Sequence, residues 1–175
     1  EMCIRDRTLA AYEPTIDYIV TKVPRFDFEK FPSASGHLGV QMQSVGEVMA
    51  IGRTFRESLQ KAFRSLEVGV DGLEPKWAFE EDPDLIRARS FDLTSLRFAT
   101  SFRLLKIREA FLSGKTIEEV FEITKIDMWF LNQIKMLSEQ DYEETLYQLK
   151  SKGFSDSQIA RNIRTRSDKI RKTRI

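Results

Sequence analysis

Hydrophobic and polar positions near the N-terminus follow the short period of β-strands. Residues 16–23 are dense in β-branched and aromatic side chains and are followed by Pro24, which predicts a strand that stops at the proline. In residues 25–38, phenylalanines first alternate with polar residues and then give way to Pro, Gly and Ser, which predicts a strand or extended arm followed by an exposed loop. Residues 44–52 form an apolar run bounded by glycine, and this run predicts a buried strand.

A helical period follows this strand directly. Thr54 and Glu57 match a capping box, in which the hydroxyl and the carboxylate each bind a free backbone N–H at the start of a helix. Apolar residues then recur at helical spacing: Leu59, Ala62, Phe63 and Leu66. We therefore expect a strand, a turn and a helix over residues 44–66.

Residues 68–90 interrupt both patterns with glycines, prolines and the acidic run 80–82. Beyond them there is no further proline, and the period is helical throughout. This change of composition predicts a domain boundary near residues 68–77, which we place between Glu74 and Pro75.

The second half of the chain predicts short helices separated by polar caps and glycines. One helix is expected over about residues 95–112, closed by Gly114, and another over about residues 141–152, closed by Gly153, because glycine reaches the left-handed conformation without strain. Other helices are expected to start at N-caps or capping boxes: Thr116 with Glu119, Asp127, Ser155 with Gln158, and Thr165. Their predicted core contacts are Val120, Phe121, Leu131, Ile134, Leu137, Ile159, Ala160 and Ile163.

Composition excludes several classes of protein. The chain has 175 residues, of which 41% are hydrophobic, so general disorder is excluded. A single cysteine, Cys3, excludes an internal disulfide scaffold. No apolar run approaches the roughly 20 residues of a membrane-spanning helix, and no signal peptide is recognisable. We therefore expect a soluble, cytoplasmic α+β protein without a membrane partner.

The charges are divided unevenly along the chain. Residues 152–175 hold eight basic and two acidic residues, a net +6, and because the whole chain carries +1 the remainder carries −5. Residues 153–171 are typical of a helix-turn-helix with a basic second helix, which could contact DNA phosphates. Helix pairs are also frequent in ordinary helical packing, so nucleic acid is the weaker interpretation and a solvated helix face the stronger one.

A search for catalytic chemistry assigns no residue. His37 is the only histidine and has no triad or metal-ligand partner in sequence, and nothing near Cys3 would activate its thiol. Neither phosphate-binding glycine motif is present. Adjacent carboxylates such as Glu118 and Glu119 are best explained by solvation and by the helix dipole. No catalytic, cofactor-binding or metal-ligating residue is predicted.

Three stretches together resemble one family, the large chain of carbamoyl phosphate synthase. Residues 13–32 (EPTIDYIVTKVPRFDFEKFP) and 41–54 (QMQSVGEVMAIGRT) are similar to the end of its first ATP-grasp module, and 124–131 (TKIDMWFL) lie in a stretch similar to its helical oligomerisation domain. The resemblance implies that residues 8–74 are the end of the ATP-grasp (carboxyphosphate) module and that 75–175 are most of the oligomerisation domain. The expected fold is α+β.

The resemblance also implies a function for the parent enzyme. That enzyme is a ligase that makes carbamoyl phosphate from bicarbonate, ATP and glutamine-derived ammonia, for arginine and pyrimidine biosynthesis, with ATP and Mg²⁺ or Mn²⁺ as cofactors. Its expected partners are the glutaminase small subunit and other large chains. The ATP clamp and the metal ligands of the first half would lie upstream of Tyr12, so this chain alone is expected to be inactive and to hold no cofactor.

The N-terminus departs from the family. Its metal-binding string reads Glu-Met-Asn-Pro-Arg, whereas this chain opens with Glu-Met-Cys-Ile-Arg and lacks the asparagine, so no metal role is assigned to Glu1. Residues 1–7 are predicted to be a non-native leader. An alternative hypothesis treats the chain as a stand-alone interaction module that associates through exposed aromatic residues such as Trp129 and Phe130.

Overall fold

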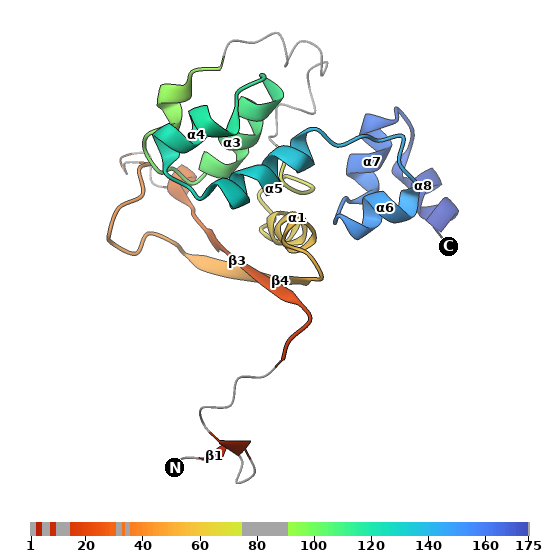
Figure 1. Ribbon diagram of the computed structural model, residues 1–175, viewed down its shortest axis with the longest axis horizontal. Coiled ribbons are helices and arrows are strands. Elements are labelled where there is room, and N and C mark those ends of the chain that lie inside the picture. The colour runs from red at the N-terminus through yellow and green to blue at the C-terminus, as the bar shows by residue number, and fades with distance from the viewer. Residues whose placement is uncertain are drawn as a thin grey trace.

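A small antiparallel sheet and a set of short helices make up the chain, as the predicted α+β class requires (Figure 1). The computed structural model describes residues 15–30, 33, 36–74 and 91–174, together with two short paired strands near the N-terminus, β1 (Cys3–Ile4) and β2 (Thr8–Leu9). The main strands are β3 (Ile19–Arg25) and β4 (Gly46–Gly52). The α-helices are α1 (Phe55–Ser65), α3 (Arg103–Leu112), α4 (Ile117–Thr124), α5 (Met128–Ser138), α6 (Leu146–Ser151), α7 (Asp156–Asn162) and α8 (Ser167–Arg174).

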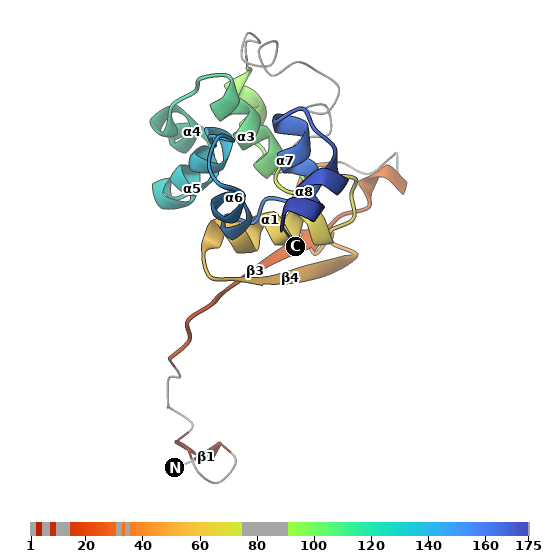
Figure 2. The same ribbon diagram turned by 90° about the vertical axis from the view of Figure 1, so that its right-hand side faces the viewer.

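Helix α1 covers one face of the sheet and leaves the other face open (Figure 2). Val23 and Ala50 are buried beneath the helix. At Gly52 an added Cβ would lie 2.7 Å from the backbone nitrogen of Ser58, so the absence of a side chain allows this close approach. On the opposite face Met49 and Ile51 are exposed. The prediction of a buried strand was therefore wrong in its burial, because only alternate residues of β4 meet a packing partner.

The strand expected to stop at Pro24 instead runs through it. Residues of β3 pair in register with β4 as far as Arg25, with Pro24 opposite Glu47. In the two-stranded sheet β3 has a free edge, and proline is tolerated on an edge strand because a missing N–H costs nothing there. The chain then turns instead of continuing as an extended arm: Phe28–Lys30 is a short 3-10 helix, and the Lys30 ammonium donates to the Asp27 carboxylate at 2.7 Å.

Helix α1 begins where the sequence predicted. The hydroxyl of Thr54 accepts from the Glu57 N–H at 3.2 Å, but the Glu57 carboxylate accepts from the N–H of Arg53 rather than that of Thr54. The predicted N-cap at Thr54 is confirmed. The second hydrogen bond of the capping box, made by the Glu57 carboxylate, goes to the backbone of the residue before Thr54. The predicted apolar stripe is buried in full: Leu59, Ala62, Phe63 and Leu66.

The helix expected over residues 95–112 is divided. Asp92 caps a 3-10 helix, η3 (Leu93–Leu96), and α3 starts only at Arg103. Between them the backbone pairs with the loop after β3: the Leu38 N–H donates to the Ala99 carbonyl at 2.8 Å. This tertiary pairing occupies backbone groups that a continuous helix would need.

Helix α6 also starts later than predicted. The Asp141 carboxylate accepts from the Glu143 N–H in a turn, and the true capping box is formed by Thr145 with Gln148. The capping boxes of Thr116 with Glu119 and Ser155 with Gln158 and the Asp127 N-cap are confirmed. Gly114 and Gly153 take the expected left-handed conformation, with φ of 80° and 89°.

The core runs through the helices and under the sheet as one cluster. Most of the predicted helical contacts are buried in it: Val120, Leu131, Ile134, Leu137, Ile159 and Ala160. Ile163 is 45% exposed, because the chain leaves α7 just before it. Among the described residues, none of the helices has the length and apolar character needed to cross a bilayer.

Candidate association surface

Three aromatic rings, located at the starts of helices α1 and α5, form a cluster at the surface. The Asp127 carboxylate accepts from the Trp129 N–H at 2.8 Å and so caps α5, which places Trp129 and Phe130 in its first turn. Phe55, the first residue of α1, lies beside both. The ring centroids are 5.0 Å apart for Trp129–Phe130, 5.2 Å for Phe55–Phe130 and 5.6 Å for Phe55–Trp129. We call these three residues the aromatic cluster.

The aromatic cluster remains open to solvent although its rings pack on one another. Trp129 is 52% exposed and Phe130 is 43% exposed. Met128 and Met136 on the same helix are also exposed. Helix α5 thus buries the row formed by Leu131, Ile134 and Leu137, and it presents a second apolar surface away from the core. Trp129 and Phe130 are thus exposed, as the interaction-module hypothesis requires, and apolar surface of this kind is typical of interaction sites.

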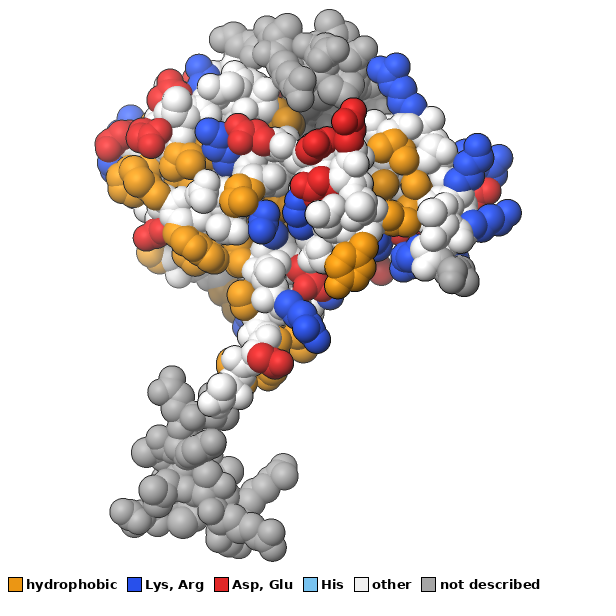
Figure 3. All heavy atoms as spheres, turned by 45° about the vertical axis from the view of Figure 1, so that its right-hand side comes forward, with side chains coloured by type: hydrophobic (Ala, Val, Ile, Leu, Met, Phe, Trp, Pro, Cys, Tyr) orange, Lys and Arg blue, Asp and Glu red, His pale blue; other side chains and the backbone are white. Residues whose placement is uncertain are grey.

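Hydrophobic side chains gather in patches with charged ones between them on the face drawn in Figure 3. The same view shows basic side chains near the C-terminal end. Four of the eight basic residues of 152–175 make ion pairs with acidic residues in the described part of the chain, which include Lys152 with Glu144 at 2.5 Å and Arg161 with Asp71 at 2.7 Å. The other two are Arg166 and Arg174, each with one carboxylate. These pairs favour the solvated-face interpretation of the basic end over a DNA contact.

A second constellation lies inside the protein, and sequence reasoning missed it. The side-chain oxygen of Gln60 accepts from the Leu73 N–H at 2.7 Å and from the Gln158 amide at 3.3 Å. Arg108 donates to the Leu73 carbonyl. These bonds hold the segment after α1 against α3 and α7. No periodic signal could have found them, because buried polar residues break the apolar pattern on which such reasoning depends.

Charged side chains extend this network. A guanidinium nitrogen of Arg108 lies 3.5 Å from the Glu74 carboxylate, and both residues are 5% exposed. Arg161 reaches the same carboxylate at 3.1 Å. Burial, with Glu74 nearby, raises the pKa of the Tyr142 hydroxyl, so Tyr142 stays neutral at physiological pH. We call this set the polar junction: Gln60, Asp71, Leu73, Glu74, Arg108, Gln158 and Arg161.

The residues considered for catalysis are not brought together. His37 is exposed, and its ring stacks on Phe98 with centroids 5.2 Å apart. Glu1 and the side chain of Cys3 lie outside the described residues. Within the described part of the chain, no group of three or more His, Cys, Asp or Glu side chains is placed to hold a metal ion.

Comparison with known proteins shows the class of domain: residues 47–175 match the family model described as the carbamoyl-phosphate synthetase large chain, oligomerisation domain. The chain is 47% identical to the carbamoyl phosphate synthase large chain of Pseudomonas aeruginosa over 96% of its length, and 45% identical to that of Halomonas eurihalina over 96%. It is 47% identical to that of Buchnera aphidicola over 95%. The chain therefore belongs to the carbamoyl phosphate synthase large chain family.

The match covers only part of these relatives. The chain spans 16% of the length of each of the three. The family model begins within β4, upstream of the boundary predicted between Glu74 and Pro75. That boundary stays a prediction because residues 75–90 lie outside the described residues, as do most of residues 1–7.

Proposed function

We propose that the chain is a connecting and self-associating segment of a large chain that makes carbamoyl phosphate from bicarbonate, ATP and glutamine-derived ammonia. The observation that carries the proposal is the exposed aromatic cluster on a chain whose family model describes an oligomerisation domain. Tryptophan and other aromatic side chains are enriched in interfaces, and tryptophan and tyrosine carry much of the binding energy there. We propose that large chains associate with one another through this surface.

Catalysis, on this proposal, belongs to the rest of the parent enzyme, in the cytoplasm and together with a glutaminase subunit. ATP and its divalent metal ion would be held by residues that precede Tyr12 in the family and by the second ATP-grasp half. The isolated chain should then show no bicarbonate-dependent ATP hydrolysis. Release of phosphate from ATP, measured with and without bicarbonate, tests this directly, and bicarbonate-stimulated release by the purified chain would contradict it.

Sedimentation velocity over a range of concentrations tests the self-association. The unaltered chain is expected to form a dimer or larger species, and the variant with Trp129→Ser and Phe130→Ser is expected to associate at least about 30-fold more weakly, because loss of an interface hot spot costs about 2 kcal/mol or more. Tyr147→Ser is the matched control, since Tyr147 is an 82% exposed aromatic residue on another helix. A chain that stays monomeric at the highest concentrations would refute the proposal.

A further inference from the structure

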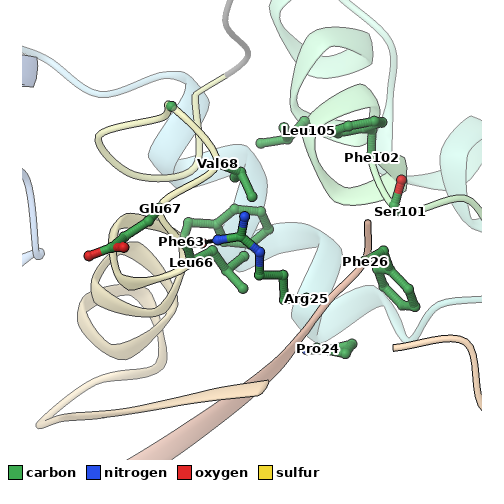
Figure 4. A pocket seen from close by; sticks show the side chains of 11 residues that line it. Pro24, Arg25, Phe26, Phe63, Leu66, Glu67, Val68, Ser101, Phe102 and Leu105 are labelled. Atoms are coloured by element: carbon green, nitrogen blue, oxygen red, sulfur yellow. Dashed lines mark hydrogen bonds between the residues drawn. The ribbon is translucent and has the colours of Figure 1, made fainter. Parts of the chain in front are cut away.

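A cavity of about 260 Å³ lies where three parts of the chain meet (Figure 4). Its walls come from the end of β3, from the C-terminal end of α1 with the turn that follows, and from the start of α3. The first two parts belong to the predicted ATP-grasp end and the third to the predicted helical domain. Small-molecule sites occur preferentially at such junctions.

Arg25 gives the cavity a fixed positive charge. One terminal nitrogen of its guanidinium, Nη1, donates to the Leu66 carbonyl at 2.7 Å, and Nε lies 3.5 Å from the Asp27 carboxylate. No described residue accepts a hydrogen bond from the other terminal nitrogen, Nη2. A guanidinium held in one orientation, with donors left over, binds a carboxylate at little further entropic cost.

The carboxylate paired with Arg25, that of Asp27, also pairs with a second cation, Lys30. The Lys30 ammonium hydrogen-bonds to Asp27 and so lowers the pKa of that carboxyl, although its partial desolvation acts in the opposite direction. Asp27 is thus shared between two cations. Glu67 lies at the rim, and Figure 4 shows its carboxylate turned away from Arg25.

Apolar side chains supply about half of the surface of the cavity wall, and polar groups supply the other half. Phe63, Leu66 and Leu105 are buried, with 5%, 6% and 7% of their surface exposed, and Phe102 is 52% exposed. Phe102 lies across the cavity from Arg25 in Figure 4. A ligand that fits this wall has a flat apolar body and one anionic group. Because the volume is slightly below the roughly 300–1,000 Å³ of sites for drug-sized ligands, a compound with a single ring is the right size.

We propose that this cavity binds a small aromatic carboxylate, with Arg25 bound to the carboxylate and the ring placed among Phe63, Leu105 and Phe102. A bound ligand contacts β3, α1 and α3 together, so it stabilises the arrangement of the two predicted units relative to each other. The proposal is independent of the self-association proposed above, because none of these residues belongs to the aromatic cluster.

The test uses 4-fluorobenzoate and the neutral 4-fluorobenzamide as ¹⁹F NMR probes with the whole 175-residue chain. Saturable line broadening is expected for the benzoate at low millimolar concentration, with the benzamide at least about tenfold weaker because it lacks the charge that pairs with Arg25. Arg25→Gln should weaken benzoate binding at least tenfold. Arg97→Gln, which changes an exposed arginine outside the cavity, should leave it unchanged.

A second variant separates the site from the fold, because Arg25 also bonds to the Leu66 carbonyl at the end of α1. Ser101→Trp fills the cavity from the opposite wall and leaves the bonds of Arg25 in place. It should abolish benzoate binding while thermal unfolding shows a folded protein. Three results would each overturn the proposal. The first is equal binding of benzoate and benzamide, and the second is benzoate binding to both variants that equals binding to the unaltered chain. The third is a lack of saturable benzoate binding even at probe concentrations about 10-fold above the low millimolar range.

Discussion

At the scale of single residues, both the backbone conformation of Gly153 and the space around it require glycine. Its φ of 89° lies in the left-handed region, and an added Cβ would come within 2.9 Å of the Glu57 backbone and of the Gln60 side chain. The residue that ends α6 is thus packed directly on α1. Gly114 has a similar φ of 80° but has nothing within 4 Å of the Cβ position.

Alanine at these two positions separates backbone strain from steric overlap. Gly114→Ala should lower the free energy of unfolding by about 1 kcal/mol, the cost of a side chain in the left-handed region. Gly153→Ala should lower it by about 3 kcal/mol, because the overlap with α1 adds to the strain. Urea unfolding followed by circular dichroism measures both, and equal losses would show that the contact with α1 costs nothing.

At the scale of elements, hydrogen bonds between residues close in sequence determine where several helices begin. Helix α4 is an example: the Thr116 hydroxyl accepts from the Glu119 N–H at 3.2 Å, and the Glu119 carboxylate accepts from the Thr116 N–H at 2.8 Å. That second bond favours the ionised carboxylate and lowers the pKa of Glu119 below its ordinary value of 4.5. The neighbouring Glu118 takes no part in this capping box.

The capping box therefore predicts a loss of stability in acid. A carboxyl whose pKa is lower in the folded state stabilises the fold above its unfolded pKa, and this contribution is lost as the pH falls through the folded value. The difference in unfolding free energy between the unaltered chain and Glu119→Ala should shrink from pH 7 to pH 3. Glu118→Ala is the control, and its difference should change less. A Glu119→Ala difference that stays constant over this range would contradict the assignment.

At the scale of the whole molecule, the polar junction connects the segment after α1 to the later helices. Its segment, residues 71–74, is fixed by Gln60 of α1, Arg108 of α3 and Arg161 of α7. Removal of one partner from a buried ion pair of this kind is strongly destabilising. The remaining charge is buried, and water cannot reach it to take the place of the lost partner.

Removal of the two arginines should have unequal effects. Arg108→Met should lower the free energy of unfolding by about 3 kcal/mol, since it deprives the buried Glu74 carboxylate and the Leu73 carbonyl of a partner. Arg161→Met should cost about 1 kcal/mol, because the Arg161 side chain is 35% exposed and water can replace part of the interaction. Urea unfolding of both variants gives the comparison, and a larger loss for Arg161→Met would contradict this account.

Caps and apolar stripes could be predicted from the sequence because they depend on residues three or four positions apart. Thr116, Asp127 and Ser155 start their helices as expected, and the row of Leu131, Ile134 and Leu137 is buried as expected. Of the association surface, the sequence indicated Trp129 and Phe130. It did not indicate Phe55, which joins them only because α1 packs against α5.

The sequence by itself determined the family, the α+β class, most helix starts and the apolar side of helices α1, α4, α5 and α7, since these features depend on local patterns and on similarity. Tertiary structure alone decided which face of β4 is covered, where the helix before Arg103 is interrupted, and how Gln60 meets Gln158. The last pair is separated by 98 residues. Contacts at such distances depend on how completed elements pack, because only packing brings their backbone and buried polar groups within bonding distance.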